Sequence, residues 1–478
     1  MRFEKFLSST LLLILFLYSD IKAQSAQTAF ELTPELFNEM VKAYHPNAFK
    51  ANLLTDKAKQ KLREARGKFD PQLYSELDHK VFKKSQYFSN QESGIKIPTL
   101  GGVEFKAAFE KNEGVFLNPE NSVPEQGLGI IGISIPVLQG MFTDQRRTGL
   151  RQAKSGQDMA QADLILSLNS LLYEAQSAYW EWAGAYYLLE ALNEFENASR
   201  IRFEAIKNGY FQGDQAAIDT TEALIQWQEA QRMLQDTDAK YQKYFFDLQN
   251  FLWDERGVPL EVSGNLKPIN FPELELTTTF AIDSLSDWME TQKSNHPKLQ
   301  KFGAKQAILT AEKRLKIEKL KPKLNLEYNM LSQSADFGNG YFQQGMYENN
   351  YKFGFEAKFP LFLREARGSL NQTKIKLQEN ELDVWQAQQE IKNKVWTYFQ
   401  QSELLNTQVS QYRETVGLYL RMVQAERTKF DNGESSLFLV NSRELKWISA
   451  REKYIKGKVT YFKTIAAFYE AMGTLHLQ

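Results

Sequence analysis

Two stretches of this 478-residue chain contain no proline, and their length restricts the possible fold more than any other feature. All thirteen prolines lie at or before Pro360, and none falls within residues 137–258 or 361–478. Proline breaks a helix because it lacks an N–H group and clashes with the preceding turn. We therefore expect a very long helix in each of the two stretches.

Apolar residues in both stretches recur in alternating steps of four and three. In the second stretch this seam runs from Val384 to Val423 and includes two polar residues. In the first stretch it is uninterrupted and consists of Leu164, Leu168, Leu171, Ala175, Ala178, Trp182, Ala185, Leu189 and Leu192. Such spacing is typical of left-handed supercoiled helices. The seams alone do not distinguish this fold from two ordinary coiled coils.

The chain contains one structural unit twice. His45 and Pro71 are 26 residues apart, as are His296 and Pro322, and both histidines precede a proline. Further along, the segments 152–213 and 372–433 begin with matching residues and end at a glycine. The register indicates a duplication in which each copy has a short helix, a strand pair, a long helix, a tight turn and a return helix.

Glycines end both long helices. Gly213 and Gly433 stand where each helix would stop, and glycine accepts the left-handed conformation of that position. Each helical arm before the turn has about 60–70 residues, or roughly 100 Å at 1.5 Å per residue. A compact domain of 55.3 kDa has no room for such an arm.

Strand candidates lie between each short helix and its long helix. Residues 323–330 and 351–359 alternate apolar and polar side chains, and residues 129–135 and 73–81 do so less completely. The apolar face of the predicted strands includes Ile131, Ile133, Ile135, Tyr351, Phe353, Phe355 and Phe359, and the opposite face includes Lys352, Glu356 and Lys358. Period-two alternation predicts one apolar and one wet face. A strand of about ten residues suits a tilted bilayer crossing, although a soluble sheet packed on helices has the same pattern.

Four strands cannot close a barrel with an interior, and a membrane tolerates no open sheet edge. We therefore expect copies of the chain to share one barrel. Three copies would supply twelve strands, which lies between the filled barrel of about 8 strands and the porin of about 16. In this arrangement the apolar face contacts lipid, and Lys352, Glu356 and Lys358 line the lumen.

The N-terminus predicts export. Residues 1–23 have basic residues followed by an apolar stretch that is shorter than the roughly 20 residues of a membrane span, so we expect a cleaved signal peptide. Without cysteine the chain has no thiolate catalysis, disulfides, cysteine-ligated zinc or lipoprotein acylation. A formal charge of -1 argues against nucleic-acid binding, and a mean hydropathy of -0.48 argues against a helical membrane protein.

No pattern of catalytic residues is present. The glycines in residues 127–132 resemble a dinucleotide motif, but the sequence continues as a strand into Pro136 instead of opening a helix. The four histidines lack metal-ligand spacing, and the acidic residues are spread along helical faces. We therefore expect no enzyme activity, no cofactor and no metal site.

These features together resemble the TolC-type outer-membrane efflux proteins, from about Thr28 to Gly473. The resemblance depends on the duplicated unit, the two glycine turns and the strand–proline–helix junctions at residues 135–138 and 359–362. It implies a mainly α fold with a minority of β. The duplicated strand–long-helix hairpin unit would give four β-strands to a trimeric 12-stranded barrel and helices to a long periplasmic α-helical barrel.

The resemblance also implies function and partners. The protein would be a homotrimeric duct in the cell outer membrane, in contact with outer-membrane lipid. It would export drugs, other small molecules or proteins delivered by an inner-membrane pump and a periplasmic membrane-fusion adaptor. The alternative is a periplasmic coiled-coil scaffold or adaptor without a membrane barrel.

In the family the two helical turns form the periplasmic entrance and contact the adaptor. The matching residues here are Gly209, Gly213, Asp214, Asp219, Gly433, Glu434 and Ser435. Asp219 matches an acidic position that helps latch neighbouring hairpins, and Ser435 stands at its partner position. Where family members carry acidic residues that narrow the entrance, this chain has Leu439 and Ser442. An acidic constriction is therefore not expected at those two positions.

The expected domain boundaries follow from the repeat. They are a signal peptide at 1–23, a first repeat at 24–255, an equatorial connector at 256–285, a second repeat at 286–473 and a tail at 474–478.

Overall fold

The computed structural model describes residues 30–261, 266–276, 285, 288, 295–332 and 349–477. The expected signal peptide lies outside these residues. The described residues form two compact units, each built from both repeats. We call them the turn unit (within Met1–His45, Glu174–Thr277 and Leu404–Lys463) and the sheet unit (within Pro46–Tyr173, Thr278–Glu403 and Thr464–Gln478).

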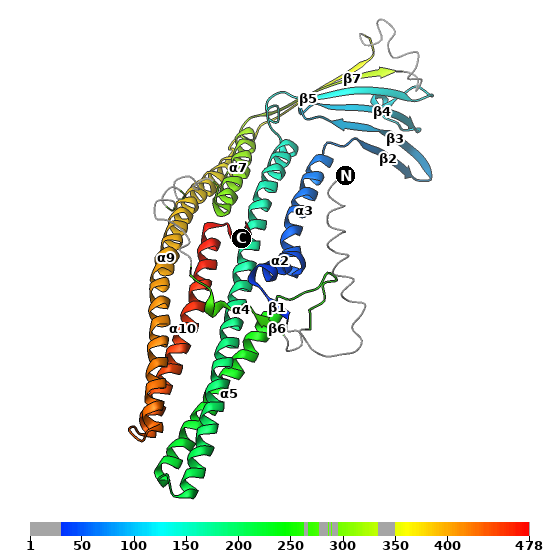
Figure 1. The fold of residues 1–478 in the computed structure, drawn as a ribbon. Coiled ribbons are helices and arrows are strands. Elements are labelled where there is room, and N and C mark those ends of the chain that lie inside the picture. Colours follow the sequence, from blue (N-terminus) through cyan, green and yellow to red (C-terminus); the bar gives the residue numbers. More distant parts are fainter. Residues whose placement is uncertain are drawn as a thin grey trace, which may run out of the picture. The chain divides into compact units, whose positions relative to one another are not determined.

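Helices make up most of the chain. The helices are α2 (Pro34–Tyr44), α3 (Pro46–Gly67), α4 (Gln145–Gln212), α5 (Ala217–Gln249), α7 (Pro297–Glu318), α9 (Arg364–Asp431) and α10 (Leu437–Met472). Both α4 and α9 have 68 residues, so the prediction of one very long helix in each proline-free stretch is confirmed (Figure 1). Of the helices in the described ranges, none has both the length and the apolar composition needed to cross a membrane.

The short helices show the same duplication. Both α3 and α7 have 22 residues, and each begins at a proline that follows a histidine. His296 caps α7, since its Nδ1 accepts a hydrogen bond of 3.1 Å from the backbone N–H of Lys298. Its Nε2 lies 3.1 Å from the carbonyl oxygen of Ala471. The histidine therefore connects the start of α7 to the end of α10 within the sheet unit.

One antiparallel sheet dominates the sheet unit (Figure 1). Its strands are, in spatial order, β2 (Gln72–Phe82), β3 (Ser85–Pro98), β4 (Glu104–Glu113), β5 (Leu128–Pro136), β7 (Lys323–Ser332) and β8 (Tyr351–Lys358). The sequence predicted four strands, and that number must be corrected to six because β3 and β4 were missed. Residues 85–94 are rich in Ser, Asn, Gln and Gly, which are uncommon in strands and hide the alternation.

The additional strands belong to the first repeat. The starts of β2 and β5 are 56 residues apart, whereas the starts of β7 and β8 are 28 residues apart. The β3–β4 hairpin occupies the longer interval. The four predicted strands are thus the duplicated ones, and the described part of the second repeat has no counterpart of the hairpin.

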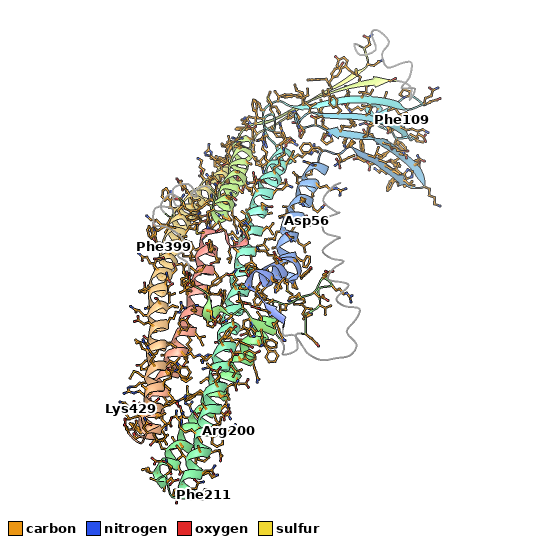
Figure 2. The ribbon with its side chains drawn as sticks, viewed as in Figure 1. Asp56, Phe109, Arg200, Phe211, Phe399 and Lys429 are labelled. Carbon is orange, nitrogen blue, oxygen red and sulfur yellow. The ribbon has the colours of Figure 1, made fainter. Side chains whose placement is uncertain are left out.

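Each unit has its own apolar core. In the turn unit, α4, α5 and α10 pack through Leu192, Phe195, Ala230 and Ile448, and again through Phe203, Ile206, Ala223 and Leu437. In the sheet unit, α9 and α10 pack through Val395, Phe399, Phe468, Ala471 and Met472 together with Leu285; Figure 2 labels Phe399.

A two-stranded parallel sheet lies in the turn unit and pairs β1 (Phe30–Leu32) with β6 (Leu266–Pro268). The Tyr179 hydroxyl on α4 donates a 2.6 Å hydrogen bond to the Leu32 carbonyl oxygen. Lys458 on α10, which is 2% exposed, donates to the carbonyl oxygens of Phe271 and Pro272 at 2.8 and 2.9 Å. These bonds fix both chain segments on the long helices.

Candidate functional site: a two-faced sheet and two helical turns

The strand pairing places apolar side chains of all six strands on one face of the sheet, because residues paired across strands share a face. In the second half of the sheet these residues are Ile131, Ile133 and Ile135 of β5, Met330, Tyr328 and Leu326 of β7, and Tyr351, Phe353 and Phe355 of β8. In the first half they are Leu73 and Leu77 of β2, Ile95 and Ile97 of β3, and Phe105, Ala107 and Phe109 of β4. We call this the apolar face.

Many side chains of the apolar face are exposed. Leu73 is 85% exposed, Phe353 58% and Phe355 61%. Aromatic and aliphatic residues in such numbers require a partner, since a monomeric soluble protein seldom exposes a large continuous apolar surface. Phe359 follows the last residue of β8 and is also exposed, but the strand pairing does not assign it to a face.

The opposite face carries charges, and we call it the polar face. The predicted lumen residues Lys352, Glu356 and Lys358 lie opposite Asn329, Asn325 and Lys323 of β7. Glu356 accepts a 3.2 Å hydrogen bond from Asn325 and forms ion pairs with Lys323 and Lys358. These contacts connect β7 and β8 through side chains that a wet surface can solvate.

The polar face continues into the first half of the sheet. Glu92 of β3 forms a 2.7 Å ion pair with Lys106 of β4 and accepts a hydrogen bond from the Tyr74 hydroxyl of β2. One carboxylate therefore connects three neighbouring strands. The glycine motif at residues 127–132 continues into β5, which confirms that this segment is a strand.

The first helical turn has the geometry that its glycines predict. Gly213 has a φ of +86°, and its N–H donates to the Tyr210 carbonyl oxygen at 3.1 Å. The N–H of Asp214 donates to the Gly209 carbonyl oxygen at 2.9 Å, which closes the end of α4. Asp219 lies in the first turn of α5, where a negative charge is favourable.

The second turn repeats this geometry. Gly433 has a φ of +77°, and the N–H of Glu434 donates to the Lys429 carbonyl oxygen at 2.8 Å. The Ser435 hydroxyl donates a 2.5 Å hydrogen bond to Glu426 and so lowers the pKa of that carboxyl group. Ser435 thus interacts with its own hairpin. Because Ser435 is not a basic residue, the sequence does not predict an ion-pair latch between this position and Asp219.

A buried carboxylate near the turns was missed by sequence reasoning. Glu444 of α10 is 1% exposed and forms ion pairs with Arg202 of α4 and Arg427 of α9. Arg202 Nη1 lies 2.7 Å from Glu444 Oε2, and Arg427 Nη2 lies 2.6 Å from Glu444 Oε1. We call these three residues the Glu444 cluster. It connects the two helical hairpins within the turn unit.

Asn441 extends the cluster to the fourth helix. Its side-chain oxygen accepts a 3.1 Å hydrogen bond from Arg202, and its Nδ2 donates to Glu222 of α5 at 3.3 Å. The available sequence signal was the position of Glu444, because it continues the buried stripe of Leu437, Val440 and Ile448 on α10. A charge on a buried stripe requires a partner.

Exposed apolar side chains surround both turns. Phe211 at the first turn is 74% exposed, and Figure 2 shows it at the end of the α4–α5 hairpin. Ile218 is 74% exposed, and Phe438 at the second turn is 64% exposed. Such residues on helix ends favour contact with another protein.

The described residues contain no group of three or more His, Asp or Glu side chains that could hold a metal ion.

Part of the sequence and the fold are similar to those of known proteins. Residues 288–474 match the family model described as outer membrane efflux protein. The comparison with curated proteins found no match. Among solved structures, the outer-membrane channel OprN is 13% identical with a TM-score of 0.68, and the match covers 92% of this chain and 90% of that chain.

Two further solved structures are similar. The CmeC outer membrane channel of Campylobacter jejuni is 12% identical with a TM-score of 0.65, covering 95% of this chain and 90% of that one. The outer membrane protein VceC of Vibrio cholerae is 14% identical with a TM-score of 0.64, covering 92% and 96%. At these identities the structural likeness establishes the fold.

Proposed function

We propose that this chain is a TolC-type outer membrane efflux protein and works as a passive export duct, and the family match over residues 288–474 and the fold support this proposal. Small molecules or proteins would pass through its interior to the outside. The energy would come from an inner-membrane pump. The observation that carries the proposal is the sheet, whose apolar and polar faces continue across all six strands.

The two faces support a lipid-facing wall around water. Strands β2, β3, β4, β5 and β7 have 9–14 residues, which is enough for a tilted crossing of about 9–11 residues, and β8 with 8 residues is one residue shorter. The apolar face would meet acyl chains, and the polar face would line the lumen. Glu92 and Glu356 keep their ion-pair partners on that wet side.

The open edges of the sheet support assembly of several copies. In the described part of the chain, β2 pairs only with β3 and β8 only with β7. Unpaired backbone groups are not tolerated in the hydrocarbon region. We propose that three copies close one wall, as the family resemblance implies.

The helical turns would form the periplasmic end of the duct. The exposed Phe211, Ile218 and Phe438 around Gly213 and Gly433 support contact with a periplasmic membrane-fusion adaptor. Asp214, Asp219, Glu434 and Ser435 lie on the same two helix ends. The Glu444 cluster would hold the hairpins together while the adaptor binds.

Lysines on the apolar face test the proposal. Phe353→Lys with Phe355→Lys should block assembly, because a lysine near the bilayer midplane costs about 2–4 kcal/mol. The matched control places two lysines on the polar face, as Ser134→Lys with Asn329→Lys. Ser134 pairs with Glu104 and Glu327, so its lysine meets opposite charge.

The measurement is the amount of heat-modifiable oligomer in the outer-membrane fraction. We expect loss for the apolar-face variant and near-normal amounts for the control. Normal insertion of the apolar-face variant would remove the lipid contact from the proposal. Release of the unmodified chain by osmotic shock would favour a periplasmic scaffold instead.

A further inference from the structure

We propose that all six strands belong to the membrane wall and that β8 of one copy pairs with β2 of the next copy. Three copies of a six-stranded sheet then give eighteen strands. The inference rests on the proposed outer-membrane assembly and adds the subunit interface and the width of the duct. Since barrel diameter grows roughly linearly with strand number, this wall would be about 1.5 times as wide as one of twelve strands.

The apolar face does not stop at the duplicated strands. The β3–β4 hairpin adds Ile95, Ile97, Phe105 and Phe109 to it, in register with Leu73 of β2 and the isoleucines of β5. A hairpin standing free in water would expose these side chains on an otherwise polar surface. Within the wall they extend the surface that meets lipid.

The polar face also continues across the β3–β4 hairpin. Glu92 of β3 lies between Tyr74 of β2 and Lys106 of β4 and contacts both. The hydrogen bond from Tyr74 to Glu92 therefore connects the hairpin to β2 on the side expected to face the lumen.

Small residues bring β3 and β4 close together. A Cβ added to Gly94 would lie 2.5 Å from the carbonyl oxygen of Ala107 and 2.8 Å from the Cβ of Ala108. Gly94 and Ala108 face each other on the polar face. Glycine in a strand marks a close approach or a bend at a barrel corner.

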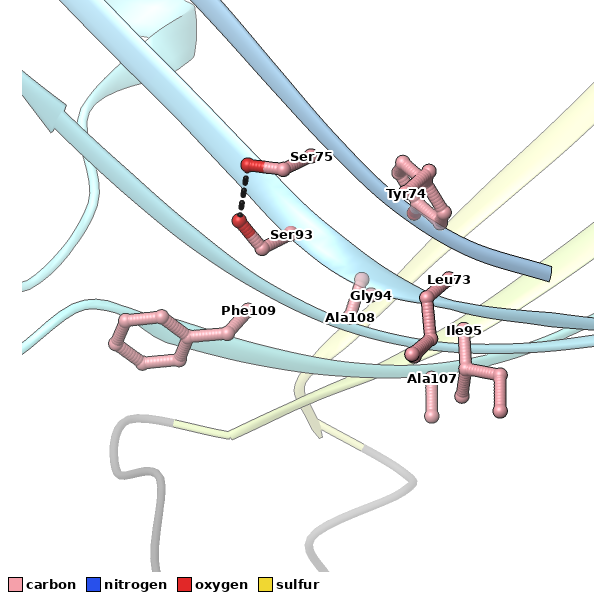
Figure 3. Close-up of a pocket in the computed structure, with 9 residues that line it drawn as sticks. All are labelled: Leu73, Tyr74, Ser75, Ser93, Gly94, Ile95, Ala107, Ala108 and Phe109. Atoms are coloured by element: carbon pink, nitrogen blue, oxygen red, sulfur yellow. Dashed lines mark hydrogen bonds between the residues drawn. The ribbon is translucent and has the colours of Figure 1, made fainter.

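Figure 3 shows the same region with Leu73, Ile95 and Ala107 close together. Residues of β2, β3 and β4 line a hollow of about 650 Å³ in this region. The hairpin therefore packs as an integral part of the sheet.

The two edges are suited to each other. Five successive antiparallel pairings separate β2 from β8, so the two strands run in opposite directions. β8 of one copy can thus pair antiparallel with β2 of the next, with the apolar faces on the same side. Within one copy the two edges are about 24 Å apart at 4.8 Å per strand spacing, too far for direct pairing without closure.

In the competing arrangement, the wall consists of the four duplicated strands, β2, β5, β7 and β8, and the β3–β4 hairpin lies outside it. Such a wall would need β2 to leave β3, and β5 to leave β4. It would give up the ladders from Gln72 to Phe82 and from Glu104 to Glu110. The two arrangements differ in the neighbours of β2 and in the number of strands.

Cysteine crosslinking tests the subunit interface through β2–β8 pairs. Because β8 would neighbour β2 of the next copy in both arrangements, a β2–β3 pair separates the two, and the absence of native cysteine removes any background. Full-length protein in outer membranes would carry one cysteine in β2 and one in β8, both on the polar face. The test set pairs Gln72→Cys, Glu76→Cys or Asp78→Cys with Lys352→Cys, Glu356→Cys or Lys358→Cys. Single-cysteine variants are the matched controls, and Asp78→Cys with Asn90→Cys, paired in β2 and β3, checks the intact ladder.

We expect at least one β2–β8 pair to give covalent dimers and trimers after oxidation, and the β2–β3 pair to crosslink within one chain. A β2–β8 bond confined to one chain, or loss of the β2–β3 crosslink in the assembled protein, would overturn the inference. An electron cryomicroscopy map of the trimer would give the number of strands in the wall. We expect eighteen strands, and a wall of twelve strands would overturn the inference. Absence of any membrane oligomer would instead refute the proposed function.

Discussion

Removing the carboxylate of the Glu444 cluster is the sharpest test of the turn unit. Glu444→Gln keeps the shape of the side chain and removes its charge, which leaves Arg202 and Arg427 close together without a shared counter-ion. The Glu444 side chain is 1% exposed, the Arg202 side chain 16% and the Arg427 side chain 46%. The carboxylate therefore has little water to replace the lost contacts.

The size of the effect follows from this burial. Breaking a buried ion pair typically costs about 3–5 kcal/mol. Arg427 is nearly half exposed and can turn toward water, so solvent screening reduces that figure. We expect the opening of the hairpins to become easier by about 2–3 kcal/mol, which corresponds to roughly a 30- to 150-fold faster local exchange.

Hydrogen exchange of the assembled, full-length protein measures the effect. Peptides from residues 437–448 and 198–206 should exchange faster in Glu444→Gln, and peptides from β5 should not change. Glu452→Gln is the control on the same helix, because its partner Lys456 is 63% exposed and such pairs contribute about 0–1 kcal/mol. A combined Arg202→Leu and Glu444→Met variant should regain protection, since apolar residues often replace a buried pair without loss. Unchanged exchange in Glu444→Gln would refute the structural importance of the cluster.

Two further predictions concern the duplicated turns. Burial lowers the pKa of His296 to about 4 from its ordinary 6.5, so the unfolded chain binds the proton more tightly and stability is lost as pH falls from 6.5 to 4. His296→Asn, which can still cap α7, should weaken this acid dependence of the thermal unfolding temperature, and an unaltered profile would contradict the assignment. Gly433→Val should impair export without loss of the trimer, because a left-handed φ of +77° costs a side-chain residue about 1–2 kcal/mol. Gly417→Val, in open space on α9, is the control, and normal drug resistance of Gly433→Val would exclude the turn from the mechanism.

Much of the architecture could be predicted from local signals. The proline-free stretches and their glycine ends located α4 and α9, and the mainly α, duplicated fold is confirmed. Residues 288–474 match the outer membrane efflux protein family model. Strands β5 and β8 could be recognised because isoleucines and aromatic residues alternate in them. These elements could be predicted because each is encoded by a pattern within a short stretch of sequence.

What was missed depends on distant or weak signals. β3 contains many small polar residues, so only its pairing with β2 and β4 reveals it as a strand. Glu444 resembled a solvated helical acid because its partner Arg202 is 242 residues away in sequence. The roles of Asp219 and Ser435 at the turns stay predictions for the same reason, since they concern surfaces that other chains would contact.

The unequal length of the two repeats indicates how such a chain can evolve. A hairpin inserts two strands of opposite direction, so β5 still leaves the sheet at the end where α4 begins. A single added strand would have reversed that exit and separated the strand from its helix. Addition of strands in twos lets the first half of the sheet gain a hairpin while each long helix still begins at the same end of the sheet.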